Sequence, residues 1–387
     1  MEEKKPKNIL YLDVQLENSI ISSIEFIKEL ISLGHNVTCY ILDELEFLYK
    51  PTGARLKTFH IDKEAFKQVP KNIVKKAVIP ITIARSYIII IEDILKSGDK
   101  YDFLIANAFY DAKEMNKKLN IPTVIAKYDG ILGEKTPYVE LTKARRNNFW
   151  IPVNKKYNLN IKDFFVQYYS PDADYKLMFN SKLCQTELKL IDDSFYFIGP
   201  CFDQRSIEET FNFKKDENKK LIYMSLGNLI DKDINFYKIF FEAFGDSKEY
   251  QVVINIGKKE NIKDFGNIPN NISVFNSVPL KQILSLADVF ICSGEINEVF
   301  EASLSNMPMI VISKDPLQVE SGTLIQKNEA GIYLDEDTDD LNSELINKNV
   351  ETYLANKEKY KKGLKKIAES FKEARNERKK ILEKIFN

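Results

Sequence analysis

Two groups of residues in this sequence carry side chains that could do chemistry. Asp13 and Glu17 lie around the start of an apolar-faced helix, where a carboxylate can accept a proton from a substrate hydroxyl. The second group runs from Ser293 to Glu301 and follows a short apolar strand, with Gly294 permitting a sharp turn into a helix. Such a turn directs backbone N–H groups and the positive end of the helix dipole at an anion. A solvated turn carboxylate and a βαβ unit without a ligand are the structural alternatives.

Histidine and cysteine are too scarce to supply other familiar kinds of site. The chain has only His35 and His60, so no Ser-His-Asp or Cys-His set is expected, and His35 fits a structural role beside a helix end. Glu295 and Glu298 without a histidine or cysteine partner are a weak basis for a metal site, and no metal is expected. The four cysteines have no CxxC spacing, which favours reduced thiols in a cytoplasmic protein.

Length and charge favour a globular protein of two domains. The chain has 387 residues and a formal net charge of −1, which gives no reason to expect a nucleic acid partner. The first residues are charged and lack the apolar region of a signal peptide. No apolar run is long enough to span a bilayer, so no transmembrane segment is expected.

The first half of the chain alternates between strand and helix patterns. Helix residues Ile20, Ile24 and Ile27 share one face, and Gly34 ends that helix. The segment Ala77–Lys96 predicts a packed helix interrupted near Pro80; the alternatives are a membrane contact or a pocket lining for an apolar ligand. The expected strands are Asn8–Val14, Val37–Leu42, Phe103–Ala106 and Thr123–Ala126.

The second half repeats this alternation after a linker. Its expected strands are Leu221–Leu226, Gln251–Gly257, Ile272–Phe275, Asp288–Cys292, Met309–Ile312 and Ile332–Leu334, followed by a charged helical tail. Two doubly wound α/β domains would place a cleft between the carboxyl ends of two parallel sheets, where a ligand should bind.

Several segments, in order, resemble one family over nearly the whole chain. They are LISLGHNVTCYI at 30–41, LCQTELKLIDDSFYFIGP at 183–200, MSLGN at 224–228, NIPNNISVFNSVP at 267–279, SGEINEVFEASL at 293–304 and DPLQVESGTLIQKNEAG at 315–331. The chain resembles the macrolide-type glycosyltransferases, a bacterial branch of the nucleoside-diphosphate-sugar-dependent transferases with the GT-B fold. The resemblance implies two Rossmann-like domains facing across a cleft.

The resemblance also implies a role for each part of the chain. Residues 1–199 would form the acceptor-side domain, 200–217 the linker and 218–350 the nucleotide-sugar-side domain, while the tail 351–387 would pack back on the first domain. The residues of the family's donor site can be aligned with positions in this chain. Glu301 matches the family's ribose-binding acid, and Gln318 matches its sugar-contacting amide. The implied donor-binding residues are Gly227, Asn228, Ser293, Gly294, Asn297, Glu301, Asp315 and Gln318.

The chain departs from the family pattern at the catalytic base. The position of the family's histidine base falls on Ser19, and that of its aspartate partner falls on Asn107. Neither side chain accepts a proton at neutral pH, and losing a general base costs roughly 10²–10⁴ in rate. Asp13 or Glu17 could act as a displaced base, with Asp111 a weaker candidate.

A second departure concerns the donor diphosphate. The family's histidine becomes Ser293, a glycine becomes Glu295 and a serine becomes Glu298. Both glutamates fall in the first turn of the helix, where their carboxylates could satisfy the helix end themselves. A carboxylate about 4 Å from a phosphate repels it by about 4 kcal/mol at an effective dielectric constant near 20. That corresponds to about a thousandfold in affinity.

These observations lead to two hypotheses from different classes. In one, the protein is an inverting glycosyltransferase with a displaced base and an altered donor site. It would move a sugar from a nucleotide-diphosphate donor to a hydroxyl of a small, apolar acceptor lying under Ala77–Lys96. In the other, it is an inactive pseudo-glycosyltransferase that acts as an accessory, for example as the activator of an active relative. No tightly bound cofactor is expected in either case, and the nucleotide sugar would be a substrate.

Overall fold

The computed structural model describes most of the chain as two compact units. Unit 1 comprises Met1–Ser181, Glu187–Gln204 and Ala374–Asn387, and unit 2 comprises Lys182–Thr186 and Arg205–Glu373. The described residues are 5–13, 17–61, 71–128, 130–131, 150–161, 168, 170–185, 187–201, 211–226, 234–257, 261–313, 316–336 and 339–387.

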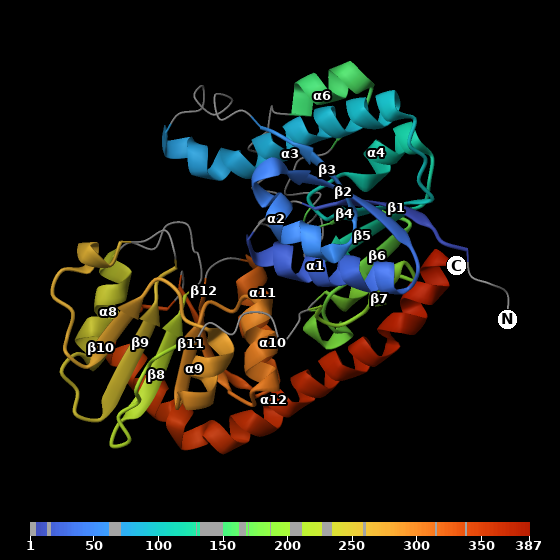
Figure 1. The fold of residues 1–387 in the computed structure, drawn as a ribbon. Helices are drawn as coiled ribbons and strands as arrows, with labels where there is room; N and C mark the ends of the chain where they lie inside the picture. Colours follow the sequence, from blue (N-terminus) through green and yellow to red (C-terminus); the bar gives the residue numbers. More distant parts are fainter. Residues whose placement is uncertain are drawn as a thin grey trace. The chain divides into compact units, whose positions relative to one another are not determined.

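Unit 1 is built on a seven-stranded sheet with the order β3-β2-β1-β4-β5-β6-β7, in which every paired neighbour is parallel (Figure 1). Its strands are β1 (Asn8–Leu12), β2 (Asn36–Leu42), β3 (Arg55–Phe59), β4 (Phe103–Asn107), β5 (Thr123–Lys127), β6 (Tyr175–Met178) and β7 (Phe195–Phe197). Its helices are α1 (Glu17–Ser32), α2 (Glu46–Tyr49), α3 (Lys71–Ser97), α4 (Ala112–Leu119) and α6 (Trp150–Tyr157).

Unit 2 is built on a six-stranded parallel sheet with the order β10-β9-β8-β11-β12-β13. Its strands are β8 (Lys220–Ser225), β9 (Tyr250–Asn255), β10 (Ile272–Phe275), β11 (Val289–Cys292), β12 (Met309–Ser313) and β13 (Gly331–Asp335). Its helices are α8 (Ile234–Phe244), α9 (Leu280–Leu286), α10 (Ile296–Leu304), α11 (Pro316–Lys327) and α12 (Ser343–Phe386), whose last residues belong to unit 1.

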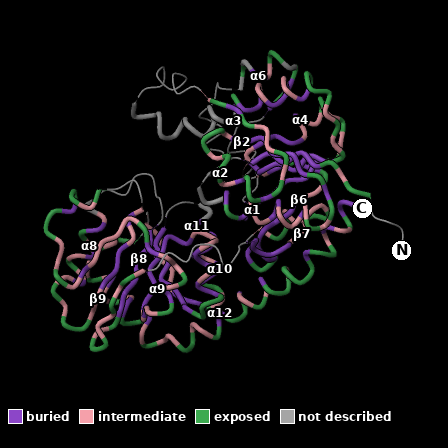
Figure 2. Tube along the Cα trace, viewed as in Figure 1, coloured by how far each residue is buried: buried purple, intermediate pink, exposed green. Residues whose placement is uncertain are grey.

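The central strands form because their residues are apolar on both faces. Every residue of β4, β5, β11 and β12 is buried, which is the pattern of parallel strands covered by helices on both sides. Figure 2 shows this burial concentrated in the strands, with exposed residues on the helices and loops. In unit 1, α3 and α4 cover one face of the sheet, while α1 and the end of α12 cover the other. The prediction of two doubly wound α/β domains is confirmed.

Each sheet has one point at which the strand order reverses. In unit 1 this point lies between β1 and β4, and in unit 2 it lies between β8 and β11. Loops leaving the carboxyl ends of the two strands diverge there, so a ligand can enter between them. Asp13 and Asn107 stand at this point in unit 1, whereas Ser225 and Ser293 stand at it in unit 2. The cleft between the two sheets stays a prediction.

The structure differs from the sequence prediction at Pro80. We expected a helix interrupted there, but α3 continues from Lys71 to Ser97. Proline removes one backbone donor from a helix interior, yet the helix beyond it buries Tyr87, Ile90 and Ile94 in the core. We infer that this burial outweighs the lost hydrogen bond. None of the helices in the described part of the chain has the length and apolar content needed to cross a lipid bilayer.

The end of α12 is held to unit 1 by a buried arginine. Arg378 donates from Nε to the carbonyl oxygen of Ile198 at 2.7 Å and from Nη2 to that of Gly199 at 2.9 Å. Its Nη1 lies 3.1 Å from Oε2 of Glu29 on α1. Phe386 also packs edge-on against Phe103, with ring centroids 5.0 Å apart. These contacts attach the last residues of the chain to α1, to β4 and to the segment that follows β7.

Candidate functional site

The turn after β11 is shaped by a serine and a glycine. Ser293 is fully buried, and its backbone N–H donates to the carbonyl oxygen of Ser225 at 3.1 Å, extending the pairing of β11 with β8. Gly294 has a φ of +85°, and a Cβ atom on it would lie 2.7 Å from Cγ1 of Val311. Both the backbone conformation and the close approach therefore require glycine.

Helix α10 begins directly after this turn. Glu295 is its N-cap residue, and the side chain of Glu295 makes no capping hydrogen bond to the helix. The first N–H groups of a helix have no partner within the helix, and together with the helix dipole they attract an anion. The side chain of Glu295 therefore does not cap α10, although the carboxyl group of Glu298 accepts a hydrogen bond from the backbone N–H of Glu295 at this helix end.

Glu298 lies in the first turn of α10, but its side chain points into unit 2. It is 7% exposed, and Oγ of Ser293 donates to its Oε2 at 3.2 Å. Burial, helped by the carboxylate of Glu295, raises the pKa of Glu298 to about 8, although hydrogen bonds from Ser225, Ser293 and the backbone of Glu295 oppose the shift. The uncharged, protonated form of Glu298 is therefore favoured relative to that of a solvated glutamate.

This finding corrects the sequence argument about repulsion. We expected Glu295 and Glu298 to oppose a phosphate together as two carboxylates in the first turn of the helix, unless a cation bridged them or their side chains turned away. For Glu298 the structure argues against that expectation, because burial raises the pKa of its carboxyl group and favours the uncharged form.

Glu301 and Gln318 lie on neighbouring helices of the same unit. Glu301 is half-buried one turn along α10, and burial raises its pKa, while Lys281 of α9 acts in the opposite direction. Gln318 of α11 is buried, and its Oε1 accepts a hydrogen bond of 2.8 Å from Oγ of Ser313 at the end of β12. That bond fixes which end of the Gln318 amide faces the strand.

The corresponding place in unit 1 holds Asp13 and Asn107. Asp13 is 2% exposed, and its Oδ2 accepts a hydrogen bond from the hydroxyl of Tyr49. Oδ1 of Asn107 accepts from the backbone N–H of Phe109 at 3.2 Å, so this side chain stabilises the turn after β4. Asp111, the weaker base candidate, caps α4 by accepting from the N–H of Glu114 at 3.1 Å.

Tyrosines surround Asp13, and sequence analysis missed them. Besides Tyr49, the hydroxyl of Tyr110 lies 3.5 Å from the carbonyl oxygen of Asp13. The hydroxyl of Tyr128 is 2.7 Å from Oγ of Ser23 on α1. Tyr49 is 36 residues from Asp13 and Tyr110 is 97, so no local spacing in the sequence relates them.

Some of the predicted site residues cannot be placed in this way. Gly227, Asn228 and Asp315 lie outside the described residues. Glu17 and Ser19 belong to the first turn of α1, but their side chains also lie outside the description. In the described part of the chain, no cluster of three or more histidine, cysteine, aspartate or glutamate side chains could hold a metal ion.

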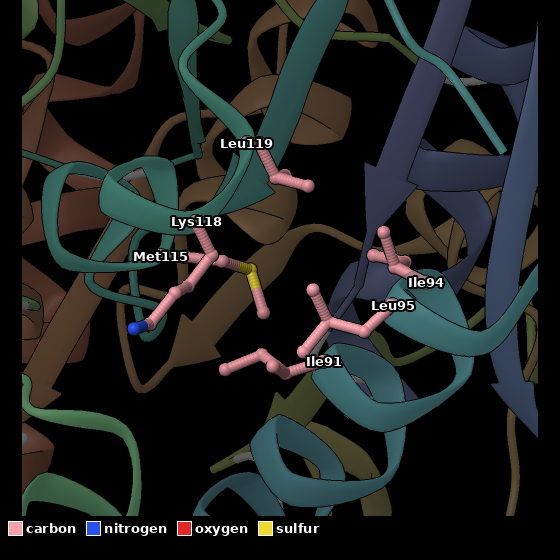
Figure 3. A pocket seen from close by; sticks show the side chains of 6 residues that line it. All are labelled: Ile91, Ile94, Leu95, Met115, Lys118 and Leu119. Carbon is pink, nitrogen blue, oxygen red and sulfur yellow. The ribbon is translucent and has the colours of Figure 1, made fainter. Parts of the chain in front are cut away.

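A shallow apolar hollow lies between α3 and α4 (Figure 3). It encloses about 210 Å³, including space open to solvent, and is lined by Ile91, Ile94, Leu95, Met115, Lys118 and Leu119. Because α3 and α4 end just before β4 and β5 begin, their last turns lie toward the amino ends of the strands. The hollow therefore lies away from Asp13 and Asn107. Ile91, Ile94 and Leu95 nevertheless belong to the segment Ala77–Lys96, for which a pocket lining for an apolar ligand was one of the alternatives, and that alternative stays a prediction.

Comparison with known sequences gives relatives of similar length. The chain is 24% identical over 384 residues to the "Uncharacterized UDP-glucosyltransferase YdhE" of Bacillus subtilis (strain 168), covering 95% of each chain. It is also 24% identical over 340 residues to the "NDP-glycosyltransferase YjiC" of the same organism, covering 85% of each chain. No family model matches the chain.

Solved structures show the same fold across the whole length. The glycotransferase of kitacinnamycin matches with a TM-score of 0.77 and 19% identity, covering 99% of both chains. The spinosyn rhamnosyltransferase SpnG in complex with thymidine diphosphate matches with a TM-score of 0.63 and 15% identity, covering 97% of this chain and 99% of SpnG. SpnG has also been solved in complex with spinosyn aglycone, again with a TM-score of 0.63 and 15% identity, covering 96% of this chain and 99% of SpnG.

Proposed function

We infer the function from the premise that this chain belongs to the bacterial glycosyltransferases with the GT-B fold. We propose that it binds a nucleoside diphosphate sugar at the turn after β11 and transfers the sugar to a hydroxyl group of a small acceptor. The acceptor would bind at the carboxyl edge of the unit 1 sheet, near Asp13 and Asn107. The proposal follows the position of ligands at the reversal point of open α/β sheets.

The observation that carries this proposal is the inward orientation of Glu298. Its carboxyl group is buried against Ser293, and burial raises its pKa to about 8, so it does not place a second negative charge at the N-terminus of α10. The helix end can then receive a diphosphate through its backbone N–H groups. The sequence replacement that argued most strongly against a donor is thus compatible with one.

The remaining contacts with the donor would be made by other residues of unit 2. Gly294 lets the backbone approach the diphosphate, and Asn297 lies in the first turn of α10 beside it. We assign Glu301 to the ribose hydroxyls and Gln318 to the sugar, in keeping with the family resemblance. The SpnG complex with thymidine diphosphate and the names of YdhE and YjiC support a nucleotide donor.

The transfer itself requires a proton acceptor. In a single displacement, the acceptor oxygen attacks the anomeric carbon, the nucleoside diphosphate leaves with the bonding electrons, and the configuration at that carbon inverts. The hydroxyl proton passes to a base, for which Asp13 and Glu17 are the candidates near the family position. Asp13 already accepts from Tyr49 within the core, so a substrate would have to reach it past that contact.

The first test is calorimetry with UDP, thymidine diphosphate and their sugars, with and without Mg²⁺. Micromolar binding of any of them supports the donor site, and the absence of binding by all of them contradicts it. Turnover is then measured as formation of nucleoside diphosphate in the presence of a panel of small hydroxylated acceptors.

Glu301→Gln is expected to weaken nucleotide binding about 10- to 100-fold. A hydrogen bond to a charged group contributes about 1.5–3 kcal/mol, and 1.4 kcal/mol is a factor of ten. Titration calorimetry measures the change, with Glu249→Gln as the matched control because Glu249 is exposed in the same unit. Equal affinity in both variants would remove Glu301 from the donor site.

Binding without transfer is the second candidate function. It is favoured by the unit 1 site, where Asn107 is used in a turn and Asp13 is buried against Tyr49. A protein with these properties could act as an accessory to an active glycosyltransferase. Nucleotide binding without turnover, together with faster turnover by an active relative when this chain is added, would identify this role.

A further inference from the structure

We propose that Glu298 is a proton-linked gate of the donor site. With its carboxyl group protonated, the turn after β11 accepts the diphosphate of a nucleotide sugar, and ionisation of the group expels it. The inference rests on the donor site proposed above and adds the regulation of that site by protons. It is independent of which residue serves as the base in unit 1.

The position of Glu298 makes it suited to this role. Its backbone lies in the first turn of α10, while its carboxyl group reaches back beneath the turn to Oγ of Ser293 at 3.2 Å. Ser293 is fully buried and pairs through its backbone with Ser225 of β8. The carboxyl group is therefore enclosed between the ends of the two strands that flank the reversal point of the sheet.

Among the described groups that shift the pKa of Glu298, none carries a positive charge that would compensate its ionised form. Burial raises the pKa of Tyr223 and of Cys292, with Glu298 itself contributing, so both stay neutral while Glu298 titrates. Helix α11, which packs on α10, carries the buried Glu320. The groups that bear on Glu298 are Tyr223 and Ser225 from β8, Cys292 and Ser293 from the end of β11, and Glu295 from the turn.

The protonation change falls within an accessible pH range. Burial and Glu295 raise the pKa of Glu298 to about 8, whereas a solvated glutamate is already ionised well below neutrality. The terminal phosphate of a nucleoside diphosphate loses its last proton near pH 6, so the charge of the ligand changes little above about pH 7. The charge on the protein side of the contact therefore changes while the ligand stays the same.

The test measures the binding of UDP and of thymidine diphosphate from pH 6.5 to pH 9.5 without divalent cations. For the parent chain we expect affinity to be constant below about pH 7.5 and to fall roughly tenfold per pH unit well above pH 8, as the loss of one linked proton requires. Glu298→Gln keeps the shape and the hydrogen-bond acceptor without the charge. It should bind with nearly constant affinity across the range.

A second variant separates the gate from simple repulsion. Glu295→Gln removes the neighbouring carboxylate, which lowers the pKa of Glu298. Affinity at pH 6.5 should therefore rise, while the pH at which affinity begins to fall should move downward. Glu298→Ser, which restores the family residue, serves as a second charge-free variant if Glu298→Gln folds poorly.

The outcomes distinguish the gate from the donor site itself. Binding with the same pH dependence in the parent and in both charge-free variants overturns the gate and leaves the donor site standing. Binding by none of the proteins at any pH overturns the donor site and the gate with it. Pronounced pH dependence in the parent alone supports both.

Discussion

The double variant Ser19→His, Asn107→Asp is expected to transfer sugar about 10²–10⁴-fold faster than the parent chain, which is the usual contribution of a positioned general base. Position 19 lies in the first turn of α1, and position 107 ends the strand next to β1 in the sheet. An imidazole there would take the proton of the acceptor hydroxyl, with the new carboxylate orienting its ring.

The local structure tolerates the change at position 107. The Asn107 side chain accepts from the N–H of Phe109 through Oδ1 at 3.2 Å, and aspartate presents the same oxygen to that N–H. The turn after β4 therefore keeps its side-chain hydrogen bond. A larger side chain at position 19 should also be accommodated. In the first turn of a helix there is no preceding turn for a side chain to clash with.

Steady-state turnover and nucleotide affinity should be measured for the parent, both single variants and the double variant. Ser19→His alone should give a smaller gain, because its imidazole lacks a partner to fix the tautomer and orientation. An unchanged rate with unchanged nucleotide affinity would show that the base acts elsewhere, with Asp13 and Glu17 as the candidates. A double variant that is active beside an inactive parent would identify the parent as a binding protein.

Sequence reasoning succeeded where a strand is apolar on both faces. Strands β4 and β12 were predicted to within a residue because their apolar runs are bounded by turn residues. It missed β3, whose residues Arg55 and Lys57 are polar, because an edge strand need not be buried. The predicted break at Pro80 failed because burial of the rest of α3 offsets one missing donor.

In the candidate site, too, the features set by neighbouring residues in the sequence could be predicted, whereas those set by long-range contacts could not. Gly294 could be assigned to a tight turn from the sequence, and its φ of +85° confirms that. The state of Glu298 could not be predicted, because its protonation depends on burial against Ser293 and on the register that pairs Cys292 with Ser225. A glutamate in the first turn of a helix is normally an ionised, exposed residue. Only the fold reverses that expectation.

The protonation of Glu298 also has a consequence for stability. The ordinary pKa of a glutamate is 4.5, and burial raises that of Glu298 to about 8. Between these two pH values, the folded chain holds a proton on this group that the unfolded chain has lost. The folded state then binds more protons than the unfolded state, so the free energy of unfolding decreases as pH rises. One linked proton gives a slope of up to about 1.4 kcal/mol per pH unit. Above about pH 8 the loss is complete.

Glu298→Gln should remove this slope, because glutamine does not titrate and still accepts from Ser293. Urea unfolding of the parent and the variant at several pH values between 5 and 8.5 measures it, without nucleotide present. The difference between the two free energies isolates Glu298, since the other titrating groups are common to both proteins. From pH 5 to pH 8.5, we expect the free energy of unfolding of the variant to rise by several kcal/mol relative to that of the parent.

Glu249→Gln provides the matched control, because Glu249 is exposed and its replacement should leave the parent's pH dependence unchanged. Unfolding curves of Glu298→Gln that run parallel to those of the parent would mean that Glu298 is ionised in the folded protein. In that case the carboxylate would stand at the N-terminus of α10 at neutral pH, and the repulsion of about 4 kcal/mol expected from the sequence would apply. The stability measurement therefore tests, without any ligand, the protonation on which the donor site depends.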